Sequence, residues 1–88
     1  MNRVFLSGKL TDKPDVAYTP KGVKILKFPL WVEEDGFSVD VVYLDRQGIR
    51  DFAGMMGTTV MVSGTLMKSK DRNGTFACKA QKIIWMEE

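Results

Sequence analysis

Residues 1–32 read MNRVFLSGKLTDKPDVAYTPKGVKILKFPLWV, and this stretch decides the fold. Residues 2–11 alternate between apolar and polar, which is typical of a strand with one buried face. Proline and glycine in residues 18–22 predict a tight turn, and residues 24–32 alternate again. We therefore expect one curved strand, a turn and a second strand returning beside the first. The residues expected to face the core are Val4, Leu6, Gly8, Leu10, Leu26, Phe28, Leu30 and Val32.

Gly8 falls on the face that this alternation buries. A glycine at an inward position lets the strand bend sharply or lets another backbone approach closely. We expect one of these two roles for Gly8.

Composition limits the classes of protein that the chain can represent. Its 88 residues suit a single domain over residues 1–88 with a modest core, which favours self-association. No apolar run approaches the roughly 20 residues that a membrane-spanning helix needs. There is one cysteine and no histidine, which removes intramolecular disulfides and the commonest general base and metal ligand. We expect a cytoplasmic protein that is not an enzyme, has no cofactor and does not contact a membrane.

Charge is unevenly distributed, although the net charge is only +2. Residues 1–32 carry a net charge of +4, residues 33–57 carry −4 and residues 58–86 carry +4. Two basic, strand-rich ends favour an anionic partner.

Beyond residue 36, three more strands and one short helix are predicted. The strands cover residues 37–44, 58–68 and 75–86, and the Asn73-Gly74 pair predicts a hairpin between the last two. A narrow apolar stripe at i, i+3, i+4, i+7 predicts a short helix over residues 46–56, with Asp45 as its N-cap. The inward residues expected in the later strands are Phe37, Val39, Val41, Tyr43, Val60, Val62, Gly64 and Leu66.

This order of elements is the plan of the all-β OB-fold, a five-stranded Greek-key barrel with a short helix between the third and fourth strands. An SH3-like barrel is the structural alternative, but it usually lacks the inserted amphipathic helix.

Three segments carry a resemblance to a known family. Residues 1–32, 57–66 and 79–87 resemble, in this order, the opening, the fourth strand and the closing strand of bacterial single-stranded DNA-binding (SSB) proteins. The resemblance implies an OB-fold that binds single-stranded DNA without chemistry in replication, repair or replication restart. It also implies a homodimer or homotetramer in the cytoplasm, associated with the nucleoid.

The chain departs from that family at two places. The loop between the second and third strands, residues 33–36, is short and acidic, and no long acidic tail follows Glu88 in the sequence. In both respects the chain is similar to primosomal protein PriB, which implies replication or primosome proteins as further partners. An alternative function is therefore an OB-fold protein–protein interaction module with weak nucleic-acid affinity, and RNA is an alternative ligand.

Sequence-independent binding of single strands needs cations for the phosphates and aromatic faces for the bases. The candidate DNA-binding aromatic residues are Trp31, Phe37, Tyr43 and Phe76, and the candidate cations are Arg3, Lys9, Lys27, Lys68, Lys70 and Arg72. Each group has a structural alternative. Trp31 suits an oligomer interface equally well, alternation assigns Phe37 and Tyr43 to the core, and hairpin lysines discourage edge pairing.

Overall fold

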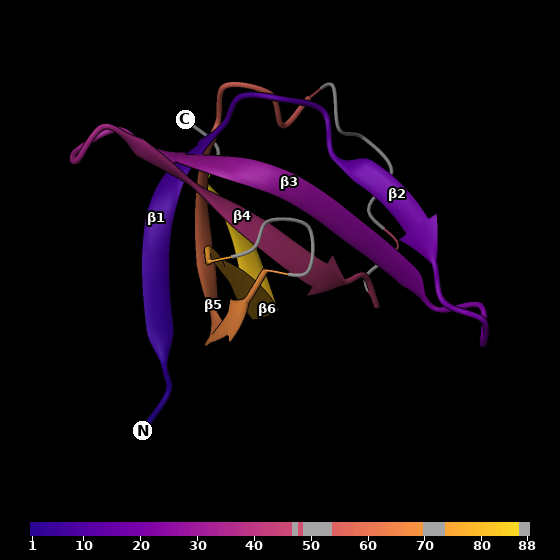
Figure 1. Ribbon diagram of the computed structural model, residues 1–88. Helices are drawn as coiled ribbons and strands as arrows, with labels where there is room; N and C mark the ends of the chain where they lie inside the picture. Colours follow the sequence, from indigo (N-terminus) through magenta and orange to yellow (C-terminus); the bar gives the residue numbers. More distant parts are fainter. Residues whose placement is uncertain (47, 49–53, 70–73, 87–88) are drawn as a thin grey trace.

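The computed structural model describes residues 1–46, 48, 54–69 and 74–86, and its strands form one strongly curved sheet (Figure 1). The sheet order is β1-β5-β6-β4-β3-β2, and an additional β1–β3 pairing closes all strands except β2 into a ring. The predicted all-β, five-stranded closed barrel is thereby confirmed. The strands are β1 (Val4–Leu10), β2 (Asp15–Tyr18), β3 (Lys24–Val32), β4 (Phe37–Leu44), β5 (Thr59–Lys68) and β6 (Phe76–Met86).

The ring closes where β1 meets β3, through the pairs Lys9↔Trp31 and Leu10↔Leu30. Next to this contact, a Cβ on Gly8 would collide with the backbone carbonyl of Trp31. Gly64 in β5 is similar, because a Cβ there would collide with the carbonyl of Lys79 in β6. The expectation that Gly8 permits a close backbone approach is confirmed, and both glycines allow the strands to cross closely.

The return strand lies beside the first strand over a short distance only. β1 pairs along most of its length with β5, from Val4↔Gly64 to Lys9↔Thr59. The first half of β3 pairs instead with β2, from Asp15↔Lys27 to Tyr18↔Lys24. β2 was missed in the sequence because all four of its residues are exposed, so it has no buried face to create alternation.

Both predicted turns around β3 are present. The Gly22 N–H donates to the Thr19 carbonyl at 2.8 Å, and Gly22 has a positive φ of 84°. The Gly36 N–H donates to the Val32 carbonyl at 2.8 Å, and its φ is 71°. Glycine adopts this left-handed region without strain, which explains its position at the end of each turn.

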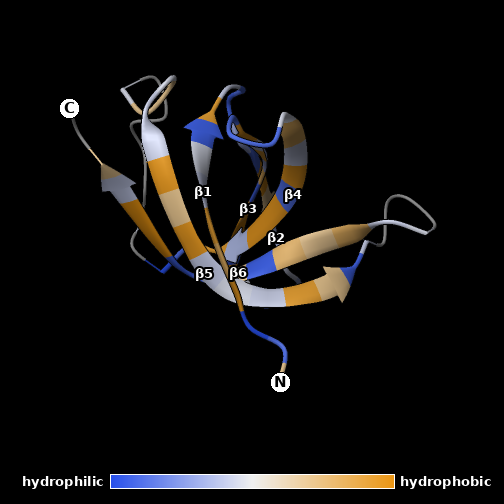
Figure 2. Cartoon of the chain, turned by 90° about the vertical axis from the view of Figure 1, so that its left-hand side faces the viewer, coloured by the Kyte–Doolittle hydropathy of each residue, from blue (hydrophilic) through white to orange (hydrophobic). Residues whose placement is uncertain are grey.

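The core follows the predicted alternation with two exceptions. Phe37, the first residue of β4, is 46% exposed, and Leu66 in β5 is 42% exposed. Figure 2 shows the far end of the β5–β6 hairpin projecting beyond the ring, and Leu66 is the third residue from the end of β5. Alternation predicts which face of a strand points inward. It does not predict how far along the strand the barrel buries that face. The buried cluster comprises Leu10, Leu26, Phe28, Leu30, Val41, Tyr43, Val60, Val62, Cys78, Ala80 and Ile83.

The helix expected over residues 46–56 falls largely on residues 47 and 49–53, which lie outside the described residues. The described part of the chain contains no helix, and residues 54–57 form a turn. The Asp45 carboxylate does accept the Gly48 N–H at 2.9 Å, as an N-cap would. Gly48, however, has a φ of 71°, which is incompatible with a right-handed helix at that residue. Among the described residues, no helix is long and apolar enough to cross a membrane.

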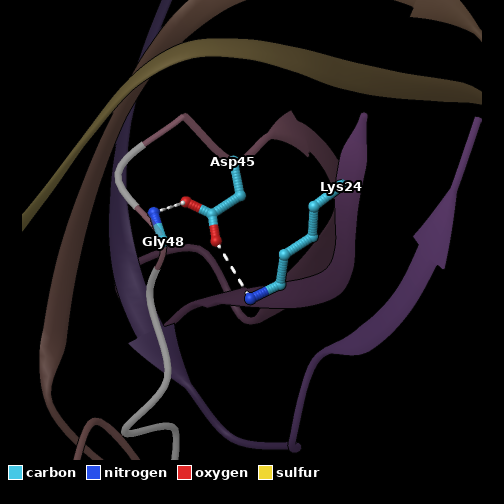
Figure 3. A network of polar contacts seen from close by, with 3 residues as sticks. All are labelled: Lys24, Asp45 and Gly48. Carbon is cyan, nitrogen blue, oxygen red and sulfur yellow. Dashed lines mark hydrogen bonds and ion pairs between the residues drawn. The ribbon is translucent and has the colours of Figure 1, made fainter. Parts of the chain in front are cut away.

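A buried ion pair holds the end of β4 against the start of β3 (Figure 3). Asp45 Oδ2 lies 3.3 Å from Lys24 Nζ, and the Asp45 side chain is fully buried while that of Lys24 is 20% exposed. The Asp45 backbone N–H also donates to the Lys24 carbonyl at 2.9 Å. Together with the bond from Gly48, these contacts fix the point at which the chain leaves the sheet.

Candidate nucleic-acid interface

A pocket of about 360 Å³ opens on the outer face of the sheet, between β2, β3 and β4 and the projecting β5–β6 hairpin. Its polar side chains are those of Asp15, Lys27, Asp40 and Ser69. The remaining lining residues are apolar: Ile25, Phe28, Pro29, Val41, Val42, Met67 and Ala77.

Strand pairing arranges the outward side chains around this pocket in three neighbouring rows, which we call the outer rows. The first row contains Lys9, Trp31 and Ser38. The second contains Pro29, Asp40, Ala77 and Met67. The third contains Asp15, Lys27, Val42, Lys79 and Thr65.

The outer rows combine cations with one aromatic residue. Trp31 is half-buried and pairs with Lys9 across the β1–β3 contact, so a ring and an ammonium group lie on the same face. Lys9 Nζ is 3.3 Å from Glu33 Oε2, but the two side chains are 41% and 66% exposed, and pairs exposed to solvent are weak. A phosphate can therefore replace Glu33 as the partner of Lys9 at little cost.

Two of the other predicted aromatic residues are exposed but do not line the pocket. Phe37 and Phe76 are 46% and 57% exposed. Strand alternation places them on the opposite face of their strands from Asp40 and Ala77, the residues of the second row. Of the predicted aromatic residues, Trp31 is the one that the structure brings to the outer rows.

Tyr43 must be removed from the predicted interface. It is 4% exposed and belongs to the buried cluster, so its ring cannot stack on a base. Burial, with a smaller contribution from Asp45, raises the pKa of its hydroxyl above the ordinary value. The residue satisfies the alternation rule, and the resemblance-based expectation that it contacts DNA is wrong for this chain.

The remaining predicted cations are dispersed. Lys68 is exposed in the projecting hairpin, opposite Phe76. Arg3 donates to Gln81 Oε1 at 3.1 Å and does not line the pocket. Lys70 and Arg72 lie outside the described residues.

Two residues outside the main set of sequence candidates complete the site. Lys79 and Met67 come next to the β3–β4 surface because β6 pairs in parallel with β4, through Asp40↔Ala77 and Val42↔Lys79. Alternation placed Asp40 on the outer face of its strand. It did not identify the residues of the adjacent strands that lie beside Asp40. That parallel pairing joins segments that are far apart in the sequence, so no local sequence pattern predicts it.

The pocket is not uniformly basic. Asp15 pairs with Lys27 across β2 and β3, whereas Asp40 has Pro29 and Ala77 as its cross-strand neighbours. Within the described ranges, no three His, Cys, Asp or Glu side chains are grouped to hold a metal ion.

Comparison with known proteins relates the chain to DNA-binding proteins. No family model matches it. It is 41% identical over 51 residues to the single-stranded DNA-binding protein of Bacillus cereus, which covers 58% of this chain and 26% of that protein. It is 56% identical over 32 residues to single-stranded DNA-binding protein 2 of Listeria monocytogenes, which covers 36% and 20%. The chain thus spans about a quarter of the length of these curated relatives.

Solved structures agree on the fold. The single-stranded DNA-binding protein of Thermus aquaticus superposes with a TM-score of 0.80 at 24% identity, covering 100% of this chain and 41% of that chain. The N-terminal domain of PriB from Thermoanaerobacter tencongensis, described as dimeric, gives a TM-score of 0.77 at 24% identity, covering 99% and 98%. At this identity the likeness concerns the barrel itself, the OB-fold that the sequence predicts. The curated relatives confirm the resemblance to single-stranded DNA-binding proteins that was inferred from the sequence, and the solved structures add a likeness in fold.

Proposed function

We propose that this chain binds single-stranded DNA without catalysing a reaction, in replication, repair or replication restart. The observation that carries the proposal is the set of outer rows, where Trp31 and Lys9 pair beside a pocket bordered by Lys27 and Lys79. Ammonium groups neutralise phosphates, and an aromatic face stacks on bases whatever their sequence. The curated relatives, named for binding single-stranded DNA, support the same function.

Trp31 provides the sharpest test of base stacking. The chain has two tryptophans, Trp31 and Trp85, so a Trp85→Phe variant reports on Trp31 alone. Oligodeoxythymidine should quench the fluorescence of this variant, and Trp31→Ala should weaken binding by about 1–3 kcal/mol, the usual contribution of one stacked base. Absence of binding by the unmodified chain at low salt would refute the proposal.

Salt dependence tests the phosphate contacts separately. On single strands, the logarithm of the affinity falls with the logarithm of salt concentration by a slope of about 0.7 per phosphate contact. Replacing Lys27 or Lys79 by glutamine should each reduce the slope by about that amount. Lys13→Gln is the matched control, because Lys13 is exposed and lies outside the outer rows, and it should leave the slope unchanged.

We further propose that the chain forms a homodimer or homotetramer. The outer face of β1, β5 and β6 carries four exposed apolar side chains, and the pairs Ser7↔Met61↔Ile84 and Thr59↔Met86 bring three of them together. Contiguous exposed apolar surface is typical of association sites. Met61→Glu should convert the oligomer to a monomer in light scattering after size exclusion. The four residues are Phe5, Met61, Ile84 and Met86.

The alternative of a protein-docking module is not favoured, because the curated relatives are named for binding DNA. Replication or primosome proteins remain proposed additional partners, testable by pull-down with and without DNA. A cytoplasmic location at the nucleoid follows from the proposed ligand.

A further inference from the structure

The β5–β6 hairpin, which forms one wall of the pocket, carries a bulge close to its junction with the ring. Ser63 pairs with Lys82 and Gly64 pairs with Ala80, so Gln81 is an extra residue in β6. A bulge of this kind bends its strand and increases the local twist. The hairpin beyond the bulge projects past the ring (Figure 2), and the direction in which it projects sets the position of its pocket residues.

Asn2 holds β5 just beyond this bulge. Asn2 Nδ2 donates to the Leu66 carbonyl at 2.8 Å, and the Leu66 N–H donates to Asn2 Oδ1 at 2.9 Å. The backbone pairs of β1 with β5 end at Val4↔Gly64, and Leu66 is the next position at which β5 turns its N–H and C=O towards β1. The carboxamide of Asn2 offers the same donor and acceptor as a peptide group. It therefore takes the place that a further residue of β1 would hold.

Arg3 holds the bulge itself. Its Nη1 donates to Oε1 of Gln81, the extra residue of β6, at 3.1 Å. β4 supports the other side of the hairpin, through its pairing with β6 from Ala77 to Ala80. Within the described ranges, no strand pairs with the open edge of β5 beyond Gly64. Two consecutive residues ahead of β1 thus bind both strands of the hairpin where it leaves the ring.

The backbone that Asn2 holds is directly connected to the pocket wall. Met67, the residue after Leu66, lines the pocket, and Thr65, the residue before it, belongs to the third outer row. Alternation turns both of these side chains to the outer face. A contact that fixes the backbone of Leu66 therefore fixes the wall on either side of it. A wall that is already in place spares the cost of ordering it when a ligand binds.

We propose that Asn2 and Arg3 are positioning residues, which brace the β5–β6 hairpin so that Met67 and Ser69 face single-stranded DNA bound at the outer rows. The inference rests on the proposed function, and it gives Arg3 a role other than the phosphate contact expected from the sequence. Neither Asn2 nor Arg3 contacts DNA; both act through the hairpin.

Hydrogen exchange tests the brace in the absence of DNA. Asn2→Ala removes both bonds to Leu66 and should speed exchange of the Leu66 amide about threefold to tenfold. The amide of Val62, which lies inside the β1–β5 pairing, is the internal reference and should keep its rate. Unchanged exchange at Leu66 overturns the brace, whether or not the chain binds DNA.

Affinity for oligodeoxythymidine tests the positioning. Asn2→Ala and Gln81→Ala change no charge, so each should weaken binding about threefold and leave the salt slope unchanged. Arg3→Gln should weaken binding by the same factor. A salt slope lowered by about 0.7 in Arg3→Gln would reveal a phosphate contact and overturn the role proposed for Arg3.

Thr19→Ala is the matched control, because it removes an exposed bond of the same kind elsewhere. The Val23 N–H donates to Thr19 Oγ1 at 3.1 Å in the turn between β2 and β3, so this variant should keep the affinity of the unmodified chain. Circular dichroism verifies that each variant is folded. Unchanged affinity in Asn2→Ala overturns the positioning inference alone, whereas absence of binding by the unmodified chain overturns the proposed function as well.

Discussion

The buried pair of Lys24 and Asp45 makes a quantitative prediction about stability. Replacing Lys24 by methionine removes the ammonium group that lies 3.3 Å from the fully buried Asp45 carboxylate, while the Gly48 N–H still donates to that carboxylate. Breaking a buried pair from one side costs about 3–5 kcal/mol, and the partial exposure of Lys24 favours the lower end. We expect Lys24→Met to lower the free energy of unfolding by about 3 kcal/mol.

The opposite truncation should cost less. Asp45→Asn keeps an oxygen that accepts the Gly48 N–H, and the ammonium group left behind on Lys24 can reach water. We expect a loss of about 1 kcal/mol, typical of one hydrogen-bonding partner. The double variant should be more stable than Lys24→Met, because it leaves no buried charge.

Urea unfolding followed by circular dichroism measures all three variants. With an m-value of about 1.5 kcal/mol per molar urea, Lys24→Met shifts the midpoint by about 2 M. The reasoning is refuted if Asp45→Asn destabilises the protein as much as Lys24→Met. A loss below about 1 kcal/mol for Lys24→Met would refute it equally, because exposed pairs give such values.

Three further predictions concern the core and the barrel crossings. Gly64→Ala should lower the free energy of unfolding by at least about 1–3 kcal/mol in the same urea titration, because its Cβ meets the Lys79 carbonyl. Burial raises the pKa of the Cys78 thiol, so the unfolded chain releases its proton first as pH rises; stability should fall above pH ~8.5, and Cys78→Ala should flatten that slope. A thiol reagent should label Cys78, which is 0% exposed, at the rate of unfolding, and labelling as fast as in a denatured control would contradict its burial.

The sequence predicted the barrel well where strands have one buried face. The boundaries of β3 and β4 and the inward faces of β1 and β3 follow from alternation, because a half-buried strand requires a period of two. β2 escaped prediction because all four of its residues are exposed, so no buried face creates an alternating pattern. The apolar spacing in residues 46–56 predicted a helix, but Gly48 adopts a left-handed conformation instead.

The candidate site was harder to predict than the fold. Lys27 and Trp31 could be placed on the outer face from the sequence because they are outward residues of a strand whose register is clear. Asp40 and Met67 belong to the same pocket only through the parallel pairing of β4 with β6, which depends on the closed ring. Tyr43 shows the reverse error, since its chemistry suits stacking while its position in the strand buries it.

The closed ring also has a consequence for how fast the protein folds. β1 finds its main partner in β5, 50 to 60 residues further along the chain, and meets β3 through two pairs only. The β2–β3–β4 segment can form from neighbouring residues, but the barrel is incomplete until both ends of the chain have arrived. Topologies dominated by such distant pairings fold in milliseconds to seconds rather than microseconds. Gly8, which lets β1 approach the carbonyl of Trp31 closely, lies beside the β1–β3 seam that closes this ring.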